Sequence, residues 1–235
     1  MVVIGFVGGG LVYRHVAQER DSRGATRLMR ALEEDDTQEM EKLLTKEEVH
    51  LRDKSGQTPL FYAARHTSQP KVIHKLLLAG ADAFATDKYG NTPLMVAAKD
   101  NPNPAITLAL AKQGGFSKKQ THNKNEALFL AAKYNRADVI KTLLVANASP
   151  AQKDANQHPA ADYLATNEQL SDQEKTDLRQ VMLVLEILEE RELFSPIEET
   201  LKPTLKQMSD SQPKKQEPAP TQTQTPPVAA NSPAK

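Results

Sequence analysis

The sequence predicts an all-α protein, a solenoid of helix-turn-helix units joined by short hairpin loops. The first observation is an internal repeat, because the segment 53–64 recurs 34 positions later as 87–98 (87 − 53 = 34). A third copy, 121–132, follows at the same step, and a more divergent copy occupies 153–164. A repeat of this length is the signature of stacked supersecondary units that bury a shared core.

Each copy also carries the residues that begin a helix. In the first clear copy, Gly56 permits a turn, Thr58 is a residue type that caps the free amides of a new helix, and Pro59 suits the first helical position. Ala63 and Ala64 then share one helical face, where small side chains let a neighbouring helix approach closely. We therefore expect the first helices of the units to pack against one another.

A second helix completes each unit. Residues 72–77 have apolar side chains at helical spacing, and Gly80 follows them as a left-handed stop. The later copies have Gly114 and Asn147 at the equivalent place, and both residue types tolerate a left-handed backbone. The agreement between copies supports the assignment of two helices to every unit.

Atypical helices are predicted to close both ends of the array. Counting back from the clear copies reaches Gly24, where a helix pair has the charged outer face expected of a first unit, so the repeats are assigned to residues 24–168. Ser171 and Glu174 form a capping-box pattern, which predicts a C-terminal capping helix over residues 171–194. Its predicted core positions are Leu178, Val181, Met182, Leu185 and Leu188.

The composition excludes several classes of function. The chain has 30 basic and 30 acidic residues, so no net positive charge is present to attract nucleic acid, and no nucleic-acid partner is expected. The absence of cysteine excludes disulfides and thiolate chemistry. The six histidines lack the spacing of a helical metal site, and no set of nucleophile, base and oxyanion donor is apparent. We expect no cofactor, no metal and no enzymatic activity.

The two terminal segments differ from the repeats. Residues 195–235 are rich in Pro, Gln, Thr and Lys and are predicted to be disordered, because they cannot bury enough apolar surface to fold. Residues 1–16 form an apolar N-terminal segment in which positions 2–13 carry no charge. As a helix these twelve residues would rise about 18 Å, less than the roughly 30 Å of a bilayer core.

Three interpretations of residues 1–16 remain open: a membrane anchor, which we prefer, the remnant of a signal peptide, or an extension without a role of its own. Basic residues follow the apolar run and would hold the repeats on the cytoplasmic side of a membrane. These residues are Arg14, Arg20, Arg23 and Arg27. A signal peptide would instead place the repeats in the periplasm or outside the cell.

The repeats resemble the ankyrin family. The family pattern of Asp, Gly, Thr-Pro-Leu-His, paired alanines, a Leu-Leu helix and a Gly-Ala-Asp loop is matched by residues 53–82 and 87–115. The family's histidine is replaced by Phe61, Met95 and Phe129, so apolar packing must substitute for its hydrogen bond. The third copy lacks the Thr-Pro pair, which predicts a helix start that frays there.

The resemblance implies a non-enzymatic protein-binding scaffold or adaptor, whose partner contacts lie on the hairpin loops and on the exposed face of the first helices. The positions that match this face are Lys54, Arg65, His66, Lys88, Tyr89, Lys99, His122, Lys133 and Tyr134. Five of them are Lys or Arg, which suggests a protein partner with an acidic patch, anchored by the tyrosines. The alternative is that they are ordinary solubilising surface residues.

Two other binding functions use the same surface. The chain could be an inhibitory or immunity-type protein that occludes an enzyme, or a secreted bacterial effector with a disordered tail. An enzyme is the third alternative and the least supported by the residues.

Overall fold

The computed structural model describes residues 20–113 and 117–190, and within them the chain is all-α. The α-helices are α1 (Arg27–Glu33), α2 (Thr37–Leu43), α3 (Pro59–His66), α4 (Pro70–Leu78), α5 (Pro93–Asp100), α6 (Pro104–Ala111), α7 (Lys118–Tyr134), α8 (Ala137–Val145), α9 (Ala160–Tyr163) and α10 (Asp172–Glu190). Two short 3-10 helices, η1 (Glu48–His50) and η2 (Leu164–Thr166), complete the described elements.

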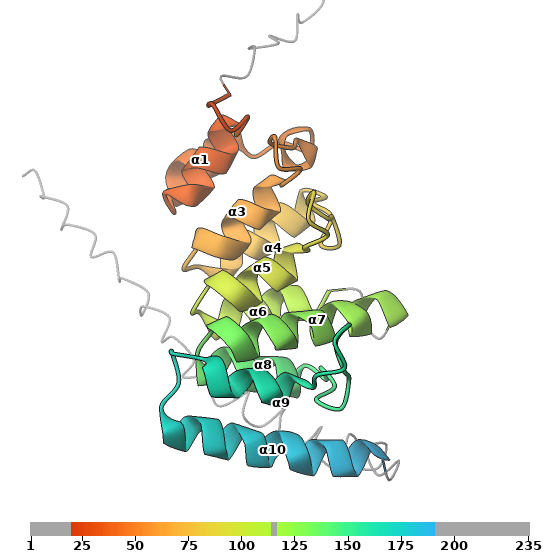
Figure 1. The fold of residues 1–235 in the computed structure, drawn as a ribbon. Coiled ribbons are helices and arrows are strands. Elements are labelled where there is room, and N and C mark those ends of the chain that lie inside the picture. The colour runs from red at the N-terminus through yellow and green to blue at the C-terminus, as the bar shows by residue number, and fades with distance from the viewer. Residues whose placement is uncertain (1–19, 114–116, 191–235) are drawn as a thin grey trace, which may run out of the picture. The chain divides into compact units, whose positions relative to one another are not determined.

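The helices form two layers (Figure 1). The first helices of the units, α1, α3, α5, α7 and α9, pack each on the next, and the second helices α4, α6 and α8 do the same behind them. The alanine pairs 63–64, 97–98 and 131–132 are completely buried between the first helices, as predicted. Helix α10 packs on α8 and α9 and closes the array.

Aspartate residues organise the hairpin loops. The Asp53 carboxylate accepts hydrogen bonds from the Ser55 and Gln57 amides, both at 2.8 Å, and Gly56 takes a left-handed backbone with φ 80°. The same arrangement occurs four times, and we call these loops the fingers. They comprise residues 21–25, 53–57, 87–91 and 154–158.

The third copy has no finger. Helix α7 begins at Lys118, capped by the Ser117 hydroxyl, and runs through the residues that the repeat assigned to a loop. The predicted frayed start at the third copy is therefore wrong. The reason is local, since Thr121 stands where the fingers have their aspartate and Lys124 stands where they have glycine. A lysine with a Cβ disfavours the left-handed turn, and without the aspartate the turn has no acceptor.

A ladder of buried asparagines links the units. The side-chain amide of Asn101 donates to the carbonyls of Ala64 and Thr67, both at 3.0 Å. Asn135 donates to Ala98 and Asn101 at 2.9 and 3.0 Å, and Asn167 to Ala132 and Asn135 at 2.9 and 2.8 Å. The three side chains are nearly inaccessible, so each ties its unit to the preceding one in a fixed register.

The predicted cap at Thr58 is wrong, although its counterpart Thr92 does accept a bond from the Met95 amide at 3.3 Å. At Thr58 the Phe61 amide donates to the backbone carbonyl instead, at 2.9 Å. The buried Thr58 hydroxyl has no hydrogen-bond partner among the described residues. The left-handed stops at Gly80 and Asn147 are present, with φ of 100° and 64°.

The capping box that starts α10 is present, because Ser171 and Glu174 exchange hydrogen bonds between backbone and side chain. Leu178 and Met182 are buried, but Val181 is 44% exposed, so its predicted core position is wrong. Leu183 and Val184 on the same helix are also exposed, at 55% and 56%.

Several predicted segments fall outside the described residues. These are the apolar segment 1–16, Gly114, residues 191–194 of the predicted capping helix and the tail 195–235. Among the helices of residues 20–113 and 117–190, none combines the length and the apolar character needed to cross a bilayer.

Replacing Asn135 with alanine should destabilise the protein by about 1–3 kcal/mol, because two buried carbonyls lose their donor. Urea unfolding followed by circular dichroism measures the change. The control is Gln38→Ala, which removes an exposed side chain of α2. If both variants lose the same stability, the ladder does not hold the register of the units.

Candidate binding surface

The nine predicted contact residues lie on the fingers and the first helices, in separate groups. Lys54, Lys88 and Tyr89 are on fingers, and Tyr89 is 80% exposed. Arg65, His66, Lys99, Lys133 and Tyr134 end the helices α3, α5 and α7. His122 was predicted on a hairpin loop and is instead exposed on α7, since the third finger is absent.

Arg65 is occupied by a neighbour in the stack, and His66 lies beside it. The Arg65 guanidinium forms an ion pair with Asp100 at 3.0 Å, which joins α3 to α5. Burial and the positive charge of Arg65 lower the pKa of His66, which disfavours its charged form. Arg65 therefore bridges two units rather than offering a free cation.

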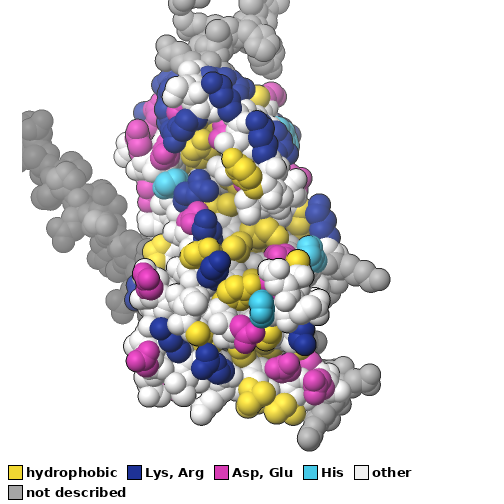
Figure 2. All heavy atoms as spheres, in the orientation of Figure 1, with side chains coloured by type: hydrophobic (Ala, Val, Ile, Leu, Met, Phe, Trp, Pro, Cys, Tyr) yellow, Lys and Arg dark blue, Asp and Glu magenta, His cyan; other side chains and the backbone are white. Residues whose placement is uncertain are grey.

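Four residues form a continuous row, which we call the Lys-Tyr ridge: Lys99, Lys133, Tyr134 and Tyr163. The Lys99 ammonium lies 5.3 Å from the centre of the Tyr134 ring, and that of Lys133 lies 5.1 Å from the Tyr134 ring and 5.7 Å from the Tyr163 ring. Neither lysine forms an ion pair within the described residues. In Figure 2, basic side chains adjoin hydrophobic ones at the level of α5 and α7.

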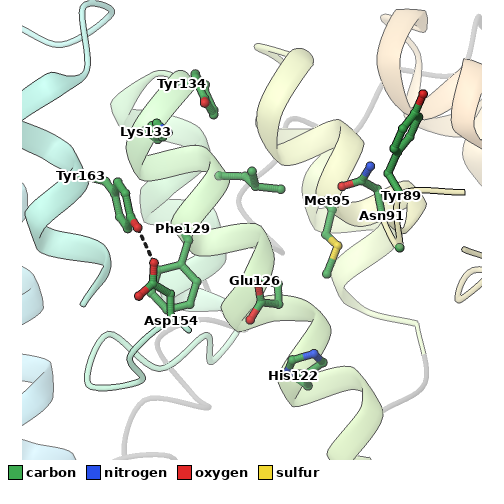
Figure 3. Close-up of a pocket in the computed structure, with 12 residues that line it drawn as sticks. Tyr89, Asn91, Met95, His122, Glu126, Phe129, Lys133, Tyr134, Asp154 and Tyr163 are labelled. Atoms are coloured by element: carbon green, nitrogen blue, oxygen red, sulfur yellow. Dashed lines mark hydrogen bonds between the residues drawn. The ribbon is translucent and has the colours of Figure 1, made fainter. Parts of the chain in front are cut away.

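A pocket of about 460 Å³ opens beside this ridge. One wall is the 87–91 finger and the other contains Asp154 and Tyr163, with α7 between them (Figure 3). Its lining residues are Tyr89, Gly90, Asn91, Met95, His122, Glu126, Phe129, Leu130, Lys133, Tyr134, Asp154 and Tyr163. It brings together four predicted residues, Tyr89, His122, Lys133 and Tyr134, while Lys54, Arg65, His66, Lys88 and Lys99 lie outside it.

Hydrogen bonds hold the far wall of the pocket in place. The Tyr163 hydroxyl donates to the Asp154 carboxylate, which also accepts from the Asn156 and His158 amides at 2.8 and 2.9 Å. The bond from Tyr163, supported by the His158 amide, lowers the pKa of Asp154, and the same bond raises the pKa of Tyr163. The Tyr163 ring meets Phe129 edge-on, with centres 6.3 Å apart.

Sequence reasoning missed Met95, Glu126, Phe129, Asp154 and Tyr163 as lining residues. One signal was available, because Tyr62 follows Asp53 by nine positions and Tyr163 follows Asp154 by nine. Tyr62 donates to Asp53 at 3.0 Å in the way that Tyr163 donates to Asp154. The recurrence marks the fourth copy as a true finger and places Tyr163 on the first-helix face.

No group of three or more His, Asp or Glu side chains in the described ranges is arranged to hold a metal ion. The side chains that line the pocket offer carboxylate, imidazole, ammonium and aromatic groups for contact with another molecule.

The hydrogen bonds of the 87–91 finger, which carries Tyr89, should weaken as the pH falls. Burial alone would raise the pKa of Asp87, but hydrogen bonds from Asn91, Gln57 and the Tyr89 amide outweigh it and lower that pKa. A lowered pKa contributes stability above the unfolded value, and that contribution is lost as the pH falls through the folded value. We expect the Tyr89 and Asn91 amide NMR shifts to titrate below the ordinary aspartate range.

Asp87→Asn is the control for this titration and should abolish the acid transition at both amides. A midpoint at an ordinary aspartate pKa, or an unchanged transition in the variant, would show that these hydrogen bonds do not stabilise the charged finger.

Comparison with known proteins agrees with this geometry. The family described as ankyrin repeats (3 copies) matches residues 9–87 and 66–157, which together span more than half of the chain. No curated protein gives a significant match over its sequence. The matched range contains three of the four fingers, the buried alanine pairs and most of the pocket. The chain belongs to the ankyrin-repeat family.

Proposed function

We propose that this ankyrin-repeat protein is a scaffold or adaptor whose Lys-Tyr ridge binds an acidic surface of another protein. The observation that carries the proposal is the alternation of two tyrosines with two lysines that form no ion pair among the described residues, on the exposed face of α5, α7 and α9. The family supports protein binding as the general role. The ridge supports the choice of an acidic partner.

The two kinds of side chain contribute differently. An exposed lysine–carboxylate pair adds at most about 1 kcal/mol, so Lys99 and Lys133 serve mainly to speed association and to exclude basic partners. Tyrosine rings bury a large area at low conformational cost and are frequent interface hot spots. Tyr134, 44% exposed and flanked by both lysines, is the expected anchor.

The inhibitory and effector alternatives would use the same ridge and differ in the identity of the partner. An inhibitor must lower the activity of a purified partner enzyme, whereas an adaptor leaves it unchanged. A secretion assay on chains lacking residues 195–235 tests the effector.

Reversing both ridge charges, with Lys99→Glu and Lys133→Glu, should remove the acidic partners recovered by affinity purification with the full chain. Both side chains are exposed at helix ends, so the fold should remain intact, as thermal unfolding would verify. The matched control is Lys71→Glu on α4, an exposed lysine of the other layer. Equal recovery by the ridge variant and the control would refute the acidic-partner proposal.

We also propose that residues 1–16 tether the repeats to a membrane, on the cytoplasmic side. The support is the uncharged run 2–13 followed by arginines. Three of those arginines are engaged by the first unit: Arg20 donates to the Arg52 carbonyl at 2.7 Å, and Arg23 and Arg27 pair with Glu33 and Glu39, both at 2.7 Å. Arg14, the fourth arginine of this set, lies outside the described residues.

Deleting residues 1–16 should move the chain from the membrane fraction to the soluble fraction of cells that express it, because the apolar run is lost. Protease added from the cytoplasmic side should digest the repeats of the intact chain. An intact chain already in the soluble fraction, or repeats protected from the protease, would contradict this tether and orientation.

A further inference from the structure

We infer that the pocket left by the absent third finger binds an arginine side chain of the partner, with Glu126 as its counter-ion. This inference rests on the proposed function, and it names a second, oppositely charged contact on the same surface. The Lys-Tyr ridge and the pocket would together recognise a partner segment that carries both signs of charge.

The pocket exists because one finger is replaced by helix. Finger 87–91 and finger 154–158 are the neighbours on either side, and in the place between them α7 presents His122 and Glu126 instead of a loop. The replacement follows from Thr121 and Lys124, which cannot form the aspartate-glycine turn. The cavity of about 460 Å³ is therefore specific to this chain's third copy.

Glu126 is the free acid of the lining. It stands at the position of Thr58 and Thr92 in the other copies, is half-buried, and makes no hydrogen bond or ion pair with any residue that the structure describes. In Figure 3 it lies between Met95 and Phe129, one helical turn from His122. A carboxylate in partly apolar surroundings gains more from a cation than one in open water.

The other two charged side chains of the lining, Asp154 and Lys133, contact neutral groups of the protein. The Asp154 carboxylate accepts from Tyr163 and from two backbone amides. The Lys133 ammonium lies over the Tyr134 and Tyr163 rings. Of the two carboxylates in the lining, Glu126 is therefore the one that no described residue hydrogen-bonds, and we expect a ligand cation to pair with it; His122 lies one helical turn away on α7.

The remaining lining favours arginine over lysine. Phe129, Tyr89 and Met95 provide aromatic and thioether surfaces, and a planar guanidinium stacks on such surfaces while its N–H groups bind a carboxylate in a bidentate manner. A lysine ammonium is more strongly hydrated and has no plane to stack. The chemistry of the pocket thus selects a guanidinium.

The two contacts have a defined spacing. Glu126 and Lys133 are seven residues apart on α7, which corresponds to about 10 Å along the helix axis. An extended peptide covers that distance in about three residues. The expected partner segment therefore has an arginine in the pocket and an Asp or Glu about three residues away, against the ridge.

Selection of random twelve-residue peptides displayed on phage against the full chain tests this directly. Wild-type protein should enrich peptides that contain arginine and an acidic residue at the expected spacing. Glu126→Gln should lose the arginine and keep the acidic residue, whereas Lys99→Glu with Lys133→Glu should lose the acidic residue. Glu168→Gln, an exposed glutamate outside the pocket, is the matched control and should select as the wild type does.

A selected peptide is then synthesised with arginine or with citrulline, which has the same shape but no charge. Citrulline should weaken binding to the wild type by about tenfold to a hundredfold, the range for loss of a charge-assisted hydrogen bond, and should have little effect on Glu126→Gln. Thermal unfolding of the variant verifies that it folds.

Two other outcomes would contradict the pocket inference alone, and a third would contradict both proposals. Enriched peptides that carry acidic residues without a recurrent arginine, or a peptide whose citrulline form binds the wild type equally well, would overturn the pocket inference and leave the ridge standing. Failure of the wild type to enrich any peptide would overturn both.

Discussion

The buried asparagine ladder is the constraint on which the rest of the structure depends. Asn101, Asn135 and Asn167 each place a side-chain amide in the core and satisfy two backbone carbonyls of the preceding unit. Packed alanines alone would allow neighbouring helices to slide, because apolar contacts have no direction. A buried amide is stable only where its partners are met, so the ladder sets one register.

Because the ladder fixes the register, the third unit keeps its place in the stack although it has no finger. The first fingers are joined by backbone bonds, from the Lys54 amide to Arg23 and from the Lys88 amide to Ser55, both at 2.9 Å. The third unit has no finger, yet Asn135 still holds it to α5. The consequence is a pocket in the surface where the family has a loop, with Glu126 in place of the helix-capping threonine.

The binding surface is therefore more varied than its nine predicted residues. Arg65 is paired with Asp100, so the positive character of the surface rests on its four exposed lysines, Lys54, Lys88, Lys99 and Lys133. Beside these lysines the pocket contributes the Glu126 carboxylate. Two adjacent regions of opposite charge discriminate partners better than a uniform basic face, since a partner must match both.

The sequence by itself determined the all-α stack, its units and most of its helix ends. These follow from local chemistry that repeats, such as Pro59 at a helix start and Gly80 at a stop, and each copy is an independent test of the others. Only the tertiary structure decided that Thr58 caps nothing, that residues 121–125 are helical and that Asp154 and Tyr163 face Glu126 across a pocket. Those outcomes depend on which residues from different units meet, and a local pattern contains no information about its neighbour across the stack.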